Sequence, residues 1–207
     1  MVPDDHETRI STLLGAPLPE AFYRRSADEV APDLLGAYLA VRPAGEAPRV
    51  GRVVEVEAYV GEEDAACHAY KGRTKRTATL YGPAGTAYVY LVYGMHELFN
   101  VVCQPEGVPH AVLVRAVEPV ERTGADPRAA NGPGKLTRLL GIDRSHDGGS
   151  LLAPPITLHA GPTPRRMVIT PRVGVAYSGR WADAPLRYYD ADSPAVSRPP
   201  RGRVGSG

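Results

Sequence analysis

The chain has 207 residues, of which 43% are hydrophobic and 23% are charged, close to the average of globular proteins. This length predicts one domain whose core needs no disulfide or metal to hold it together. No stretch of eighteen apolar residues occurs, which argues against a membrane protein, and "MVPDDHETRI" is too acidic and polar for a secretory signal. Cys67 and Cys103 match no metal or redox spacing, so free, reduced thiols are expected.

The net charge of +1 hides an uneven distribution of charged residues. Residues 1–64 carry thirteen acids and six bases, residues 71–76 carry four bases and no acid, and residues 161–207 carry eight Arg and three Asp. Runs of one sign are most often solvated surface. Basic patches on a near-neutral chain also bind polyanions, so charge alone leaves both interpretations open.

The expected elements begin with a loosely ordered N-terminal arm over residues 1–20. Apolar residues at helical spacing then predict a helix within residues 26–40. Ser26 and Glu29 have the spacing of a capping box, although Pro32 would then lie inside the helix, so a start nearer Asp28 is the alternative.

Three runs rich in β-branched and aromatic residues predict strands. They are Arg52–Val60, Thr86–Tyr93 and Ala111–Pro119. A short helix is expected in "GPGKLTRLLGI", with Pro133 at its start and Gly141 after its end. Residues 191–207, rich in Pro, Gly, Ser and Arg, are expected to form a disordered tail, which leaves one α+β domain over residues 21–190.

The first of these strands contains two carboxylates and a phenol at alternate positions. Because side chains alternate across a strand, Glu55, Glu57 and Tyr59 should share one face. The other face, with Val54, Val56, Ala58 and Val60, should meet the core. Carboxylates two residues apart lie about 7 Å from each other, which suits acid–base work on a glycosidic bond. A half-exposed strand is the alternative.

Arg115 lies in the middle of the apolar third strand. A buried charge needs a partner, and a carboxylate of the first strand is the natural candidate. The alternative is that Arg115 points to solvent at a sheet edge.

The second strand carries Tyr88, Tyr90 and Tyr93. Aromatic faces near basic loops suit stacking on nucleobases, but aromatic core is the commoner fate of strand tyrosines. The spacing of the histidines predicts no zinc site. Lys135, near a Gly-Pro helix start, either holds a phosphate or is simply exposed.

Taken together, five segments resemble the alkyladenine (3-methyladenine) DNA glycosylases of the N-methylpurine type. The segments are "EVEAYVGEEDAACHAYKGRT", "GTAYVYLVYGMHELFNVV", "AVLVRAVEP", "GPGKLTRLLGI" and "RVGV…PLRYY". The resemblance implies a curved, mostly antiparallel sheet with a few helices and long loops. It also implies excision of alkylated or deaminated purines from double-stranded DNA, without metal or organic cofactor, by a monomer. The implied compartment is the bacterial cytoplasm, at the nucleoid, or the nucleus of a eukaryote.

The resemblance also assigns roles to residues. Glu57 matches the general base that activates water, and Arg115 the arginine that helps to position it. Tyr59, His68 and Tyr90 match the residues around the flipped base, and Asn100 matches the residue that rejects the amine of normal guanine. Tyr93 matches the side chain that wedges into the duplex, with Met95 beside it, and Lys135 is expected at the DNA. Glu55 has no role in that picture.

Three positions depart from the family's pattern. Thr77 stands where Asn is usual, and Leu80 and Tyr81 stand where Met and Phe are usual, which bears on phosphate contacts and local packing. Two rival functions remain: a nucleic-acid-binding module without catalysis, and a carbohydrate glycosidase that uses Glu55 and Glu57.

Overall fold

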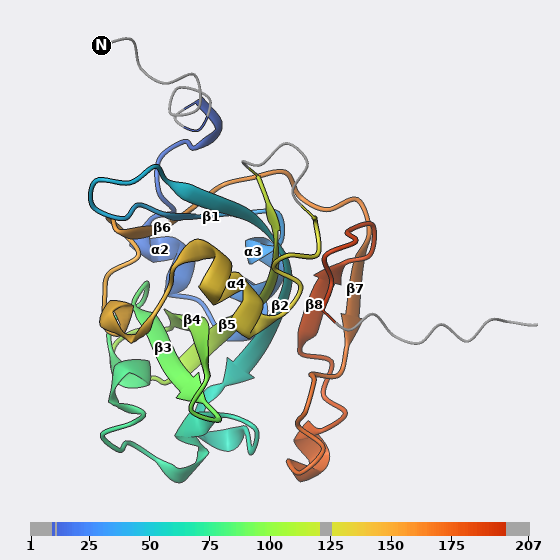
Figure 1. Ribbon diagram of the computed structural model, residues 1–207. Helices are drawn as coiled ribbons and strands as arrows, with labels where there is room; N and C mark the ends of the chain where they lie inside the picture. The colour runs from blue at the N-terminus through green and yellow to red at the C-terminus, as the bar shows by residue number, and fades with distance from the viewer. Residues whose placement is uncertain (1–9, 11, 121–125, 198–207) are drawn as a thin grey trace, which may run out of the picture.

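In the part of the chain that the structure describes, a curved antiparallel sheet and a few helices form the domain (Figure 1). The computed structural model describes residues 10, 12–120 and 126–197. The strands are β1 (Tyr38–Val41), β2 (Arg49–Val60), β3 (Ala87–Val92), β4 (His96–Cys103), β5 (His110–Pro119), β6 (Ile156–His159), β7 (Met167–Thr170) and β8 (Arg187–Asp190). They follow the order β3-β4-β5-β2-β1-β6, while β8 pairs with β2 and β7. The predicted α+β class and the curved antiparallel sheet are confirmed.

The long strand β2 is the centre of the sheet, and one of its edges pairs with two different strands. Strand β5 pairs along one of its edges, whereas the other edge pairs first with β1 and then, from Glu55 onward, with β8. The register with β5 shifts on both sides of Glu55, as in a β-bulge, which twists a strand and redirects its side chains. Val56 therefore packs in the main core, while Val54 packs against Ala116 and Ala195 in a separate cluster. The prediction that Val54 and Val56 share a face was wrong because the bulge breaks the alternation.

Three helices, α2 (Glu20–Tyr23), α3 (Ala27–Leu34) and α4 (Pro133–Leu140), belong to the described residues. Helix α3 begins with the predicted capping box of Ser26 and Glu29. It lies within the predicted range and ends before Gly36, whose φ of +89° turns the chain into β1. Helix α4 starts at Pro133 and is followed by a left-handed Gly141, as predicted.

The two faces of the sheet have different chemistry. One face forms the main core with α3 and α4. On the other face a row of residues runs across five strands: Tyr88 pairs with Asn100, Asn100 with Leu113, Leu113 with Glu57, and Glu57 with Arg187. Because directly opposed residues project to the same side, the topology gathers polar groups from distant parts of the chain on this face.

Parts of the predicted arm and tail pack on the domain. The amide of Leu18 donates to the carbonyl of Leu158 at 2.7 Å, so the end of the arm lies against β6. Residues 191–197 follow β8 over the sheet, and Ala195 is fully buried. This differs from a disordered tail that begins at residue 191, because long-range contacts, rather than local propensity, order these seven residues. The rest of the predicted tail, residues 198–207, lies outside the described residues.

Within the described ranges, the longest apolar helix is still too short to cross a membrane. The same residues contain no group of three or more His, Cys, Asp or Glu that could hold a metal ion. Cys67 and Cys103 are free thiols, and both are buried.

Candidate active site

A cavity of about 560 Å³ opens on the polar face of the sheet. Strands β2 to β5 supply its floor, and the loop after β7 supplies part of its wall. Two further wall segments are η2 (His68–Lys71) and η3 (Ala78–Tyr81). Its side chains include Tyr59, His68, Tyr88, Tyr90, Asn100, Arg115, Val173 and Tyr177.

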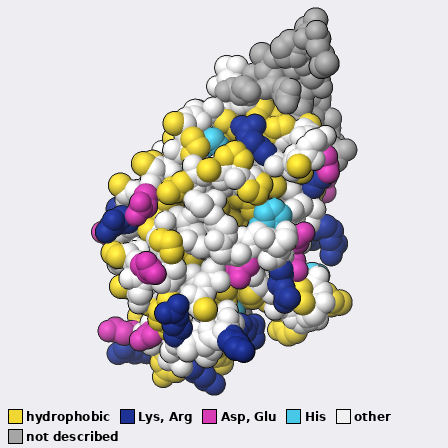
Figure 2. All heavy atoms as spheres, turned by 90° about the vertical axis from the view of Figure 1, so that its left-hand side faces the viewer, with side chains coloured by type: hydrophobic (Ala, Val, Ile, Leu, Met, Phe, Trp, Pro, Cys, Tyr) yellow, Lys and Arg dark blue, Asp and Glu magenta, His cyan; other side chains and the backbone are white. Residues whose placement is uncertain are grey.

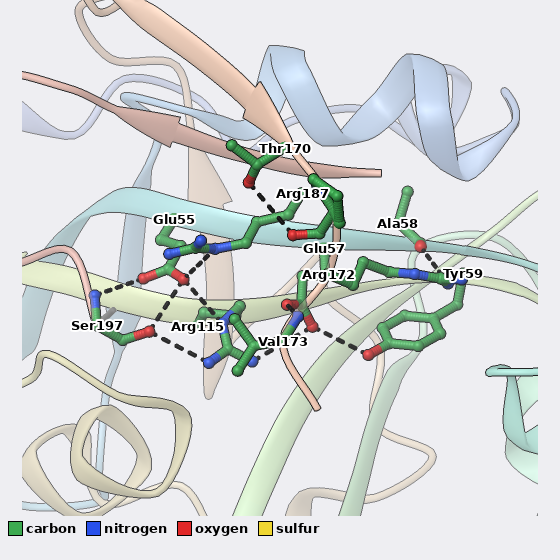
Figure 3. A network of polar contacts seen from close by, with 11 residues as sticks. Glu55, Glu57, Ala58, Tyr59, Arg115, Thr170, Arg172, Val173, Arg187 and Ser197 are labelled. Carbon is green, nitrogen blue, oxygen red and sulfur yellow. Dashed lines mark hydrogen bonds and ion pairs between the residues drawn. The ribbon is translucent and has the colours of Figure 1, made fainter. Parts of the chain in front are cut away.

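The carboxylate of Glu57 is fully buried beside this cavity and accepts three hydrogen bonds (Figure 3). The amide of Val173 donates to Oε1 at 2.6 Å. The hydroxyl of Tyr59 donates to Oε2 at 3.0 Å, and Nη1 of Arg115 donates to the same oxygen at 3.3 Å. All three donors line the cavity, so the carboxylate lies directly behind the cavity wall and is held in one orientation.

Arg115 joins the two carboxylates of β2. Its Nε donates to Oε1 of Glu55 at 2.8 Å, and its Nη1 bonds Glu57. The guanidinium is almost completely buried, which confirms the prediction of a buried charge paired with the first strand.

Glu55 is fully buried too, but its surroundings differ from those of Glu57. It accepts from Arg115, from Nε of Arg187 at 2.8 Å, and from the amide and hydroxyl of Ser197 at 2.6 and 2.9 Å. Burial alone raises the pKa of the Glu55 carboxyl, but the two guanidiniums and Ser197 outweigh burial and hold that pKa below its ordinary value. A carboxylate with its lone pairs so fully used is poorly suited to act as an acid on a sugar, which counts against the glycosidase alternative.

The residues that follow β7 hold the other side of Glu57. Arg172 is fully buried, pairs with both oxygens of Asp64, and lies 4.6 Å from the centre of the Tyr59 ring. This anchor places the amide of Val173, the next residue, on Glu57. Sequence reasoning quoted "RVGV" as a matching segment but assigned no role to Arg172 or Val173. The only signal in the sequence was a single Arg followed by Val-Gly-Val.

Three aromatic rings form one wall of the cavity. The ring of His68 lies 4.5 Å from that of Tyr90, and its Nδ1 is 3.0 Å from the hydroxyl of Tyr88. Burial first, and then the charge of Arg76, lower the pKa of His68, so its ring is neutral at pH 7. A neutral ring next to π faces does not repel a cationic guest.

Asn100 lies on the floor of the cavity with its side-chain amide fixed. Its Nδ2 donates to the carbonyl of Tyr88 at 3.1 Å, and the residue is 4% exposed. The neighbouring Phe99 points to the opposite face and is buried in the main core. Asn100, rather than Phe99, is therefore the side chain at position to contact a bound base.

The hairpin between β3 and β4 presents Tyr93 at its tip. Tyr93 and Gly94 both have positive φ, of 51° and 69°, and Met95 N bonds Val92 O, as in a type I′ turn. Tyr93 is 89% exposed and Met95 71% exposed. A non-glycine residue in the left-handed region is strained, and such strain points to a function for an exposed ring.

A second cavity of about 520 Å³ adjoins the first, and Tyr93, Arg115 and Val173 line both. It extends to the start of α4, where Lys135 lies with its Nζ 2.6 Å from Oδ1 of Asn131. Tyr93 therefore stands on the rim between the two cavities, and Lys135 lies beyond it.

The Lys and Arg side chains of residues 71–76 are exposed. In Figure 2, Lys and Arg side chains gather at the lower end of the face shown, at the height of residues 61–81 in Figure 1. Thr77 closes the basic segment: its Oγ1 accepts from the amide of Thr74 at 2.8 Å and donates to the carbonyl of Gly72 at 3.2 Å. Tyr81 donates to Glu62 at 2.6 Å. Thr77 and Tyr81 thus stabilise this region by hydrogen bonds.

The structure brings six of the predicted site residues to the first cavity and leaves three at its rim or outside. Glu57, Arg115, Tyr59, His68, Tyr90 and Asn100 form or back the cavity, while Tyr93, Met95 and Lys135 lie on the adjoining surface. Arg172, Val173, Arg187 and Ser197 complete the polar network and were missed.

Comparisons with known proteins agree with this geometry. The model of the family described as "Methylpurine-DNA glycosylase (MPG)" matches residues 21–194. A protein of Myxococcus xanthus (strain DK1622) with the name "Putative 3-methyladenine DNA glycosylase" is 53% identical over 90% of this chain and 96% of its own length. Relatives with the same name from Legionella pneumophila (strain Lens) and Anaeromyxobacter dehalogenans (strain 2CP-1 / ATCC BAA-258) are 46% and 48% identical. The first match covers 87% of this chain and 98% of the relative, the second 89% and 87%. The chain therefore belongs to the methylpurine-DNA glycosylase family and is a DNA glycosylase.

Proposed function

We propose that this protein removes alkylated and deaminated purines from duplex DNA and that Glu57 is the general base of the reaction. The observation that carries the proposal is the buried Glu57 carboxylate, fixed by three donors behind the wall of an aromatic-lined cavity.

A purine inside a duplex cannot reach this cavity, so it has to leave the base stack at a cost of a few kcal/mol. The exposed ring of Tyr93 on the rim fills the vacated space. The rings of Tyr59, His68 and Tyr90 then enclose the extruded base.

The chemical step is a hydrolysis at the anomeric carbon. A water held by Glu57 attacks C1′ while the bond from C1′ to the purine nitrogen breaks, and its electron pair leaves with the base. The water's proton passes to Glu57, and the products are an abasic sugar and a free purine. The negative carboxylate also stabilises the cation-like sugar. Arg115, Tyr59 and Val173 keep the carboxylate in the orientation that this step needs.

The preference among lesions follows from charge. An alkylated, positively charged purine leaves readily as a neutral base and stacks well on electron-rich rings. A neutral purine such as hypoxanthine leaves as an anion unless it gains a proton, so its release should be slower.

DNA contact is proposed through the exposed Lys and Arg side chains of residues 71–76 and through Lys135 at the start of α4. The amides and the positive dipole at the start of that helix suit a phosphate. One domain is enough to hold one lesion, so a monomer is expected. The proposed place of action is wherever the chromosome lies, the bacterial cytoplasm or a nucleus.

Excision on defined duplexes tests the proposal. The protein is incubated with duplexes that carry a single 7-methylguanine or hypoxanthine, and abasic sites are then cleaved with alkali. Strand breaks at the lesion, and none in the undamaged duplex, are expected. A gel shift without breaks would instead identify a binding module. The absence of both a gel shift and strand breaks is what a carbohydrate hydrolase would give.

A further inference from the structure

We propose that Ser197 is a positioning residue of the excision reaction and that residues 191–197, here called the C-terminal clasp, hold Arg115 against Glu57. The inference rests on the function proposed above and extends it to a part of the chain that lies 142 residues from Glu55 in sequence.

The first argument is the geometry around Arg115 (Figure 3). Nη2 donates to Oγ of Ser197 at 3.2 Å, while Nε bonds Glu55 and Nη1 bonds Glu57. All three guanidinium nitrogens are therefore committed, one to each partner, and the plane of the group is set. Loss of the Ser197 hydroxyl leaves a buried donor without this acceptor, which favours a different orientation of the side chain.

The second argument is competition between the two carboxylates. Arg115 lies closer to Glu55, at 2.8 Å, than to Glu57, at 3.3 Å. Ser197 donates two hydrogen bonds to the Glu55 carboxylate, one from its amide and one from its hydroxyl, so this carboxylate depends less on Arg115 for donors. Without the bond from the hydroxyl, Glu55 draws Arg115 more strongly, and the bond to Glu57, already the longer one, weakens.

The third argument is space. Ser197, Arg115 and Val173 line the second cavity, so the guanidinium has room to turn away from Glu57 when the hydroxyl is absent. In the intact protein the serine occupies that side of Arg115 and prevents the movement.

The clasp is itself held by the sheet. Ala195 packs against Val54 and Ala116, and Oγ of Ser193 donates to Oε1 of Glu118 at 2.5 Å. The amide of Ala191 donates to the carbonyl of Arg166 at 2.8 Å. None of these anchors bonds the guanidinium of Arg115, so they place Ser197 without taking part in its contact with that group.

The test compares Ser197→Ala with Ser193→Ala. Both variants remove a serine hydroxyl from the clasp, but the hydroxyl of Ser193 bonds Glu118 and not Arg115. Single-turnover excision from a 7-methylguanine duplex, the dissociation constant for that duplex and the melting temperature are measured for each. Ser197→Ala is expected to slow excision about tenfold, the size of one hydrogen bond to a charged group, with the dissociation constant unchanged. Ser197→Thr, which keeps the hydroxyl, should restore most of the rate. Ser193→Ala should lower the melting temperature with little effect on the rate, because the anchors at Ala191 and Ala195 still place Ser197.

Two results would overturn the inference: Ser197→Ala excising at the wild-type rate, or the two alanine variants losing rate in proportion to their loss of melting temperature. A wild-type protein that leaves the lesion uncut would overturn the proposed function instead, so the two failures are distinguishable.

Discussion

The phenolic hydroxyl of Tyr59 donates to Oε2 of Glu57 across 3.0 Å, two residues away on the same strand. Burial first, and then the charge of Glu57, raise the pKa of Tyr59 well above its ordinary value. The phenol therefore stays protonated, and remains a donor, throughout the neutral range. One strand thus supplies both the carboxylate and a group that orients it.

Glu57→Gln keeps the size of the side chain but cannot accept the proton of the water. It also removes the negative charge next to the cation-like sugar. General-base catalysis is worth about 10²–10⁴-fold, so single-turnover excision should fall by at least about a thousandfold while lesion DNA still binds. Glu118→Gln is the control, since Glu118 pairs with Arg52 and Ser193 and lines neither of the two cavities. Excision by Glu57→Gln within tenfold of wild type would remove Glu57 from the mechanism.

Glu55→Gln should act mainly on stability, because it removes the charge that faces both Arg115 and Arg187. Breaking a buried ion pair typically destabilises by about 3–5 kcal/mol, so a clear drop in the urea midpoint at pH 7 is expected. Glu55 is therefore no inert control for Glu57, although the family resemblance gives it no role.

The pH dependence of that loss has a definite sign. The pKa of Glu55 is lowered in the folded protein, so its contribution is complete above the unfolded value of about 4.3 and is lost as the pH falls through the folded value. The difference in stability between wild type and Glu55→Gln should therefore shrink on acidification. A difference that stays constant from pH 7 to pH 3 would show that the carboxylate charge is not what stabilises.

Asn100→Ser should change selectivity rather than rate. The fixed Asn100 amide on the cavity floor can exclude the exocyclic amine that guanine carries. Excision of guanine-type bases should rise, while release of hypoxanthine stays within about tenfold, or roughly 1.4 kcal/mol. A panel of duplexes under single-turnover conditions measures both. Unchanged guanine-type excision would place the filter elsewhere.

Tyr93→Ser should weaken the flipped state without unfolding the protein. The ring is 89% exposed, so its loss removes little packing but forfeits stacking worth roughly 1–3 kcal/mol. The fluorescence change of ethenoadenine on leaving the base stack should decrease, and Tyr93→Phe should preserve it. If Tyr93→Ser gave the wild-type signal at an equal melting temperature, the ring would not be the wedge.

Binding to undamaged duplex should weaken steeply with salt. Each neutralised phosphate contributes a slope of about −0.9 in log K against log salt. Lys75→Ala, in the exposed basic segment, should reduce that slope by about one contact, whereas Arg24→Ala, which removes an exposed arginine paired with Glu20, should leave it unchanged. A wild-type slope near zero would contradict DNA contact through these basic side chains.

Local pattern was enough to predict several parts of the structure. The apolar run around Arg115 required a buried partner, and the alternation in β2 placed Glu57 and Tyr59 on one face. Pro133 and Gly141 marked the ends of α4 because their backbone preferences act within a single turn. These features depend on neighbours in sequence, which a single chain displays directly.

The tertiary structure alone decided which groups surround the two carboxylates. The bulge at Glu55 separates Val54 from Val56, and no residue type in the run announces it. Arg172, Val173 and Ser197 reach β2 from more than a hundred residues away, so their roles depend on the pairing of β8 and on the path of the chain before and after that strand. Such long-range donors give the two glutamates different surroundings, which the local sequence does not display, and only the family resemblance set Glu57 apart from Glu55.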